Sequence, residues 1–409
     1  MIIFFYLYLF TISWNSAFAY SYFNLPSLFS FSFIFSSYIK PSSRFNLKVI
    51  KFVLIPFLFT SIYYILLSVI NPHSKVINYT LVYILIPLLY CYLPLTIKIP
   101  KNKIKNINIY FINSLLFVAL ICILESVIRF YFKYDITSLV PHLKDNYAFT
   151  FTGLGKVLNR SRAFSSEPLI AGLSLCVGLQ YCLIKLKNFF LSETYLLNRE
   201  LLIYFSYSFI FAFAIVATGS ASSFVISFFG AILLLAQVLN IFIKNLINKK
   251  LNLNIIKLFI FIILLLFSFV LIFQIFPAYQ VALENIISKI TLDKAFSSVR
   301  ARLNLFFEYI FYFINDPLGL KGSLGFYSSK TSAINWYLTL LGDIGLIGVF
   351  LTFFPLLSSI AISINSPFNN NFRKIDKLFL IIIPLMGLLF HGTFYASPVW
   401  ATILITYYL

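Results

Sequence analysis

The sequence predicts an all-α polytopic membrane protein with about 12 transmembrane helices. Of its 409 residues, 61% are hydrophobic and 11% are charged, which leaves too few polar groups to cover a water-soluble chain of this size. Apolar runs of about 20 residues recur along the chain, each long enough to cross a hydrocarbon core as a helix with all its backbone hydrogen bonds made. No Pro- or Gly-rich linker divides the chain, so residues 1–409 are predicted to form one transmembrane domain.

The predicted spans are separated by short connections, except at two long segments. The spans are 2–20, 22–39, 49–70, 79–97, 107–128, 168–186, 201–217, 221–243, 256–276, 335–356, 378–395 and 397–409. The long segments are 129–167 and 277–334.

Basic residues gather in alternate connections. If the N-terminus is cytoplasmic, more than half of the 31 Lys and Arg lie in inside connections, and the short outside connections carry only Lys75. This is the pattern of the positive-inside rule, and it predicts that both termini are cytoplasmic and that both long segments lie outside. The net charge of +19 is thus mostly topological, and no nucleic-acid partner is expected.

The first long segment ends in a charged stretch at the mouth of a span. It contains Arg160, Arg162 and Glu167, followed by Pro168. Proline suits the first turn of a helix, so Glu167 is expected at the N-cap, where a carboxylate is favoured by the helix dipole. Capping and catalysis are both open for Glu167. Arg162 is expected to bind a ligand, because small residues beside it let another group approach.

The second long segment contains an amphipathic helix around residues 299–311, expected to lie along the membrane surface. Arg300 and Arg302 are about 200° apart on such a helix, so only one of them can face a cavity. A sharp turn is expected at 315–322, where Pro317 and two glycines end the helix.

Paired arginines outside the membrane favour a diphosphate ligand, because planar guanidinium groups match its oxygens. The chain has no GxxxxGK[ST] loop, no GxSxG elbow and no cysteine spacing typical of a metal site, so neither a cofactor nor a metal is expected.

His391 is a candidate proton carrier or a packing residue. Glu125 and Asp343 lie within spans, where an acid needs a partner such as an arginine or a helix-packing salt link.

Two blocks resemble the O-antigen polymerase and ligase superfamily of bacterial inner-membrane proteins. The first, Arg162-Ala-Phe-Ser-Ser-Glu-Pro-Leu-Ile-Ala-Gly172, is similar to the family's Arg, Glu-Pro and small-residue pattern. The second runs from Arg300 and Arg302 through 316–319 to 335–348 and resembles the large periplasmic loop and its following helix. The turn at 218–222 is also similar, although an Arg often found there is missing.

The resemblance implies a metal-independent membrane glycosyltransferase. It would join undecaprenyl-diphosphate-linked oligosaccharides at the periplasmic face into lipopolysaccharide O-antigen or capsule, with a chain-length regulator as an optional partner. Arg160, Arg162, Arg300 and Arg302 would bind the diphosphate, and Glu167 would act as the base.

Two other functions remain open. A ligase, which transfers polysaccharide to a lipid core, has the same fold, but its typical His is replaced by residues 331–334, Thr-Ser-Ala-Ile. A flippase would place charges deep in several helices and show related halves. Most charges here lie in two loops, so a polymerase is preferred.

Overall fold

The computed structural model describes most of the chain. The described residues are 1–14, 24–39, 45–70, 74–132, 150–153, 156–159, 161–165, 167–191, 199–247, 296–319, 335–366, 372–390 and 397–409, with isolated residues elsewhere. Seven helices among them are long and apolar enough to cross a membrane, which confirms a helical membrane protein. They are Leu47–Ile70, Val76–Thr96, Asn106–Arg129, Pro168–Leu191, Arg199–Ala217, Ala221–Lys244 and Trp336–Ile364.

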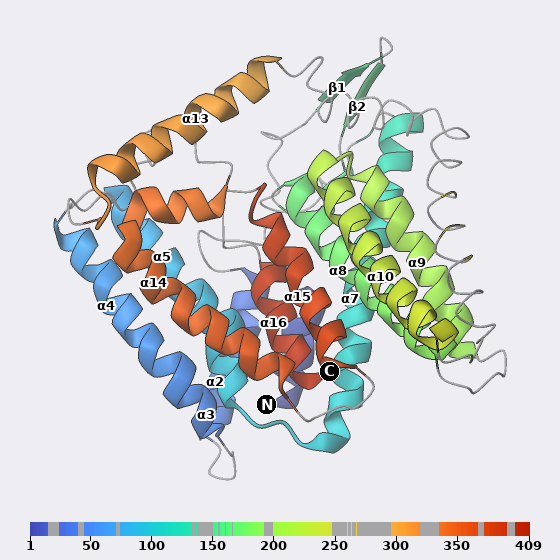
Figure 1. The fold of residues 1–409 in the computed structure, drawn as a ribbon, viewed down its shortest axis with the longest axis horizontal. Coiled ribbons are helices and arrows are strands. Elements are labelled where there is room, and N and C mark those ends of the chain that lie inside the picture. Colours follow the sequence, from blue (N-terminus) through green and yellow to red (C-terminus); the bar gives the residue numbers. More distant parts are fainter. Residues whose placement is uncertain are drawn as a thin grey trace.

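The elements follow one another along the chain as drawn in Figure 1. They are α1 (Ile2–Thr11), α2 (Leu25–Ile39), α3 (Leu47–Val49), η1 (Ile50–Leu54), α4 (Ile55–Ile70), α5 (Ser74–Pro87), η2 (Leu88–Tyr92), α6 (Leu93–Thr96), α7 (Lys101–Phe132), β1 (Thr150–Gly153), β2 (Lys156–Asn159), α8 (Pro168–Leu191), α9 (Arg199–Ala217), α10 (Ala221–Ile247), α13 (Phe296–Asn315), α14 (Trp336–Ile364), α15 (Lys374–Gly387) and α16 (Ser397–Tyr408). The strands β1 and β2 pair antiparallel.

The predicted count of twelve spans is not confirmed. The helices α1, α2, α15 and α16 have 10, 15, 14 and 12 residues, whereas a crossing helix needs about 20. The predicted span at 2–20 is helical only to Thr11 in its described part. The predicted span at 256–276 lies outside the described residues, apart from isolated positions.

One end of the molecule, here called the basal end, gathers connections that the charge pattern assigns to the cytoplasm. Asn46, before α3, donates its side-chain amide to the Tyr407 hydroxyl at 2.9 Å. The Tyr408 hydroxyl donates to the Ile97 carbonyl at 3.2 Å, and the Ser366 hydroxyl donates to the Tyr407 carbonyl. Connections following α2, α6 and α14 therefore meet at the end of α16. Figure 1 shows both termini in this half of the molecule, and α13 with β1 and β2 at the opposite, apical end.

A buried ion pair also lies at the basal end. Lys187 of α8 donates to Asp376 of α15, and both side chains are fully buried. Gln237 of α10 accepts from the Lys187 ammonium at 3.0 Å and donates to the same carboxylate at 3.1 Å. These contacts tie three helices together through charges that the apolar interior would otherwise disfavour.

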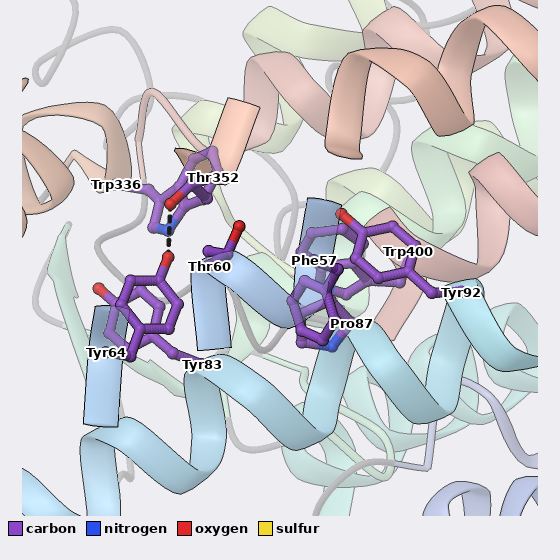
Figure 2. A pocket seen from close by; sticks show the side chains of 9 residues that line it. All are labelled: Phe57, Thr60, Tyr64, Tyr83, Pro87, Tyr92, Trp336, Thr352 and Trp400. Atoms are coloured by element: carbon purple, nitrogen blue, oxygen red, sulfur yellow. Dashed lines mark hydrogen bonds between the residues drawn. The ribbon is translucent and has the colours of Figure 1, made fainter. Parts of the chain in front are cut away.

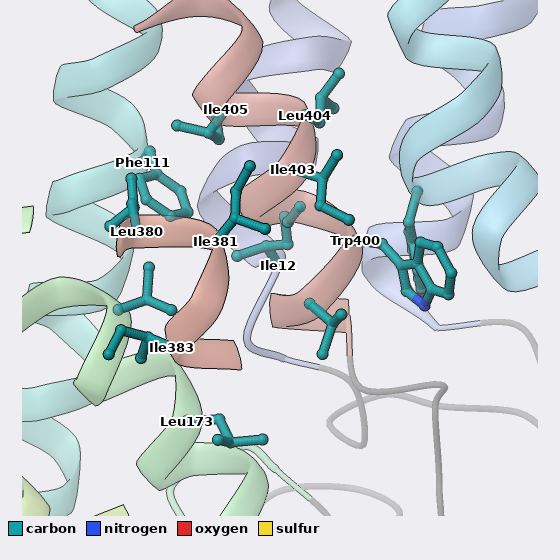
Figure 3. Packing of buried hydrophobic residues seen from close by; sticks show 14 of the residues in the cluster. Ile12, Phe111, Leu173, Leu380, Ile381, Ile383, Trp400, Ile403, Leu404 and Ile405 are labelled. Carbon is teal, nitrogen blue, oxygen red and sulfur yellow. The ribbon is translucent and has the colours of Figure 1, made fainter. Parts of the chain in front are cut away.

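The helix α16 is enclosed by its neighbours. Every residue from 398 to 409 is buried, so α16 is a core element with no described lipid-facing side. Figure 3 shows Ile405 of α16 on the side of Leu380 and Ile381 of α15. Its side chains are mostly apolar, and the hydroxyls of Thr402 and Thr406 donate to carbonyls of the helix itself, so α16 packs as a buried helix does.

The expected helix of the second long segment is α13, which lies across the apical end in Figure 1. Its Tyr309 is buried, and Leu338 of α14 packs against that residue. On its apolar face, Phe307 and Phe311 are 64% and 62% exposed. That side is thus available to lipid, in agreement with a helix lying along a membrane surface.

The turn after α13 packs on a kink in α14. Gly319, with φ +71°, lies in the expected turn at 315–322, which the structure describes up to 319, and its N–H donates to the Asp316 carbonyl at 3.0 Å. Gly345 has φ +61° and ψ −172° inside α14, a conformation that only glycine adopts readily. A Cβ on Gly345 would lie 2.2 Å from the Gly319 nitrogen. Both glycines are therefore required by this close backbone contact.

Candidate functional site

The candidate site lies where α8 begins, at the apical end. The helix starts at Pro168, as the sequence predicts. The Glu167 carbonyl accepts the N–H groups of Ile170 and Ala171 at 3.1 and 3.3 Å, which places Glu167 at the N-cap position. Its side chain is half-buried. A carboxylate here lies at the positive end of the helix dipole.

The loop that precedes α8 is held by a carboxylate from α7. One oxygen of Glu125, Oε2, accepts the backbone N–H of Arg162 at 3.0 Å and that of Ala163 at 2.8 Å. Ala163 has φ +48°, a left-handed conformation that is uncommon for a residue with a Cβ. The turn closes with the Ser165 N–H donating to the Arg162 carbonyl at 3.0 Å.

Charged side chains are concentrated and buried around this loop. Arg162 is 3% exposed, Arg129 is 9% exposed and Glu125 is fully buried. Arg129 lies one turn beyond Glu125 on α7, and its guanidinium is 2.9 Å from Glu125 Oε1. Electrostatic interactions at such a position are stronger than in water. The region therefore holds the buried ion pair of Glu125 and Arg129 and a second buried arginine, Arg162, and Glu167 lies at the start of the adjoining helix.

Two further helices fix the loop from other sides. The Ser161 N–H donates to the Ala217 carbonyl at the end of α9 at 3.3 Å. The Ser165 hydroxyl donates to the Ser13 carbonyl, just after α1, at 3.2 Å. Elements distant in sequence thus define the position of the loop that carries Arg162.

The first resembled block packs directly on the turn at 218–222. Gly219, with φ +56°, forms the tight turn between α9 and α10. A Cβ on Gly172 would lie 2.0 Å from the Ser223 hydroxyl oxygen and 3.6 Å from that of Thr218. Gly172 is therefore needed for the close approach of α8 to α10.

The starts of α8 and α14 meet at the end of α15. The Trp336 N–H donates to the Leu388 carbonyl at 2.9 Å, and the Tyr337 hydroxyl donates to the Leu385 carbonyl at 2.9 Å. On the other side of α15, a Cβ on Gly387 would lie 2.2 Å from a methyl carbon of Leu173. The second resembled block and the residue directly after the first one thus flank one helix end.

The other predicted site residues are placed less fully. Arg300 and Arg302 lie on α13, of which only the backbone is described at these positions. Arg160 and His391 lie outside the described residues. Of the predicted diphosphate and catalytic residues, the structure describes the side chains of Arg162, in the loop before α8, and of Glu167, at the N-cap of α8.

A small cavity next to α14 is a poor candidate for the site. It has a volume of about 10 Å³, which suits about one water molecule. Figure 2 shows Tyr64 and Thr352 joined by a hydrogen bond on one side and Trp400 on the other. Aromatic rings fill most of the space, so a sugar would not fit without rearrangement.

Glu125 and Arg129 are the residues that sequence reasoning undervalued. The sequence predicts for Glu125 a partner such as an arginine or a helix-packing salt link, and the structure identifies Arg129, on the same helix, as one partner. Their spacing of four residues on one helix was the available signal. The contact of Glu125 with backbone amides 37 and 38 residues later carries no sequence signal.

Within the described part of the chain, no three His, Cys, Asp or Glu residues are grouped as metal ligands would be. The metal-independent reaction stays a prediction.

A scan against models of protein families and a search of curated proteins found no match to this chain.

Proposed function

We propose that this chain is a polysaccharide polymerase that joins undecaprenyl-diphosphate-linked oligosaccharides at the periplasmic face of a bacterial inner membrane. The proposal is supported chiefly by Arg162, a buried arginine held in a defined loop at the start of a membrane helix. A prepositioned guanidinium with little surrounding water can bind a diphosphate and stabilise the charge that develops on it.

The proposed reaction is a displacement at the anomeric carbon of the donor. The acceptor sugar hydroxyl attacks this carbon, and a glycosidic C–O bond forms as the bond to the diphosphate breaks. The electron pair of that bond leaves with the lipid diphosphate, whose charge Arg162 would stabilise. Glu167 would take the hydroxyl proton. Arg160, Arg300 and Arg302 are further candidates for holding the diphosphate.

A deletion strain tests the function through the glycans that accumulate. We expect single repeat units, still translocated and still transferred to an acceptor, and no long polymer. Mass spectrometry of extracted lipid-linked glycans measures their length directly. Long chains left on the lipid diphosphate would reject the polymerase and favour a ligase. Single units trapped on the cytoplasmic leaflet would favour a flippase.

Complementing that strain with variants tests the site. Arg162→Ala should abolish long polymer in cells at normal protein level and leave only a slow residual rate with purified donor, because the proposed cation for the leaving group is lost. Arg199→Ala is the matched control, since Arg199 is an exposed arginine at the start of α9. Full-length polymer from Arg162→Ala would remove Arg162 from the mechanism.

A further inference from the structure

Glu125 is the centre of the contacts that fix the Arg162 loop. Its two carboxylate oxygens have different partners. Oε2 accepts both consecutive amides of the loop, at 3.0 and 2.8 Å, and Oε1 faces the Arg129 guanidinium at 2.9 Å. One buried side chain thus connects the backbone of the loop to a charge on its own helix.

The geometry at the loop is that of an anion-binding turn. Two successive N–H groups converge on one oxygen, and the second belongs to Ala163, whose φ is +48°. Consecutive amides in such a conformation form a concavity that favours a negative charge. The left-handed conformation of an alanine costs about 1–2 kcal/mol, so it persists only when its surroundings hold it. The carboxylate of Glu125 supplies this support.

A simple helix-packing salt link would not need these contacts. Arg129 alone would neutralise Glu125 on the surface of α7. Burying the carboxylate completely is costly unless its lone pairs are satisfied, and the two loop amides satisfy those of Oε2. The arrangement therefore ties the location of the loop to the presence of a negative charge on α7.

We infer that Glu125 is a positioning residue for Arg162, and that Arg129 orients its carboxylate. Through the amides of Arg162 and Ala163, Glu125 determines where the loop places its arginine. The role in polysaccharide synthesis rests on the proposed function, whereas the effect on the loop can be measured without it.

Hydrogen exchange of the full chain in detergent micelles tests the effect on the loop. Glu125→Leu removes the acceptor, and Glu125→Gln keeps the shape but removes the charge. We expect exchange of the amides at 161–165 to rise at least ~10-fold in Glu125→Leu and by a smaller factor in Glu125→Gln, because hydrogen bonds to a charged group are lost. Glu200→Gln, at an exposed glutamate of α9, is the control. Unchanged exchange in a well-folded Glu125→Gln protein would overturn the inference.

Initial rates with a purified lipid-linked donor test the connection to Arg162. Glu125→Gln should slow synthesis at least ~10-fold when Arg162 is present, but change the residual rate of Arg162→Ala less than about twofold, because residues acting through one another are not additive. A merely structural role would reduce both rates by the same factor, and that result would overturn the positioning role.

Failure of the proposed function would look different. If exchange at 161–165 rises as expected but Arg162→Ala synthesises polymer at the normal rate, the polymerase site is wrong and the dependence of the loop on Glu125 stands.

Discussion

Removal of the buried charge of Asp376 should destabilise the protein strongly. Asp376 and Lys187 are both fully buried, and the carboxylate also accepts from Gln237 at 3.1 Å and Asn188 at 3.4 Å. Asp376→Asn leaves a buried ammonium without its counter-charge, which costs about 3–5 kcal/mol. Lys187→Met likewise leaves the buried carboxylate without its counter-charge.

The double variant Lys187→Met/Asp376→Leu should be less destabilised than either single variant. Replacing a buried ion pair by apolar groups is often neutral or stabilising by about 1–4 kcal/mol. Against this, Gln237 and Asn188 each lose an acceptor, which costs about 1–3 kcal/mol. The order of melting temperatures is therefore expected to be wild type, then the double variant, then the single variants.

A thiol-reactive fluorescent dye can follow thermal unfolding in detergent, because the four cysteines are all free and buried. Lys51→Met, which changes an exposed lysine, is the control and should melt as the wild type does. A double variant that melts below both single variants would refute the reasoning, since it would show that the two charges do not depend on each other.

Three further predictions follow from the close contacts and the charge pattern. Gly345→Ala should destabilise the protein by at least ~2 kcal/mol, since its φ is +61° and its Cβ would meet backbone; an unchanged melting temperature would contradict the kink. Gly172→Ala should also lower the melting temperature. Adding Ser223→Gly to this variant should restore part of the lost melting temperature, because it vacates the space that the new Cβ needs. No restoration would mean that the two residues do not touch. Cysteines introduced as Lys144→Cys and Lys330→Cys should react with an impermeant reagent from the periplasm, and labelling only from the cytoplasm would reverse the orientation.

Local backbone chemistry made several elements predictable. Pro168 marks the first turn of α8, and Asn315 is the last residue of α13 before the expected turn. The number of spans was less predictable, because hydropathy gives the length of an apolar run. It does not show whether lipid or other helices surround that run. In α15, helical structure ends at Gly387, within the apolar stretch predicted to continue to 395. Lys187 lies just beyond the predicted end of the span at 168–186, yet it belongs to α8 and is buried against Asp376.

The candidate site was predictable only where its residues are close in sequence. Arg162 and Glu167 lie in one short motif, so their common location at the mouth of α8 followed from the helix start. The contact of Glu125 with the loop depends on how α7 packs beside α8, and no periodicity encodes that. From the sequence, Gly172 is only one small residue of the motif. The structure shows why a glycine is needed there, because the Ser223 side chain packs against it.

The enclosure of α16 has a consequence for biogenesis. The ribosome makes residues 397–408 after all the helices that surround them, including α7, α8 and α14. Those helices enter the bilayer before their central partner exists, so during synthesis the middle of the bundle must be filled by lipid, by a chaperone or by temporary contacts among the helices themselves. Release of α16 from the translocon would then be the step that converts a loose group of inserted helices into the compact protein.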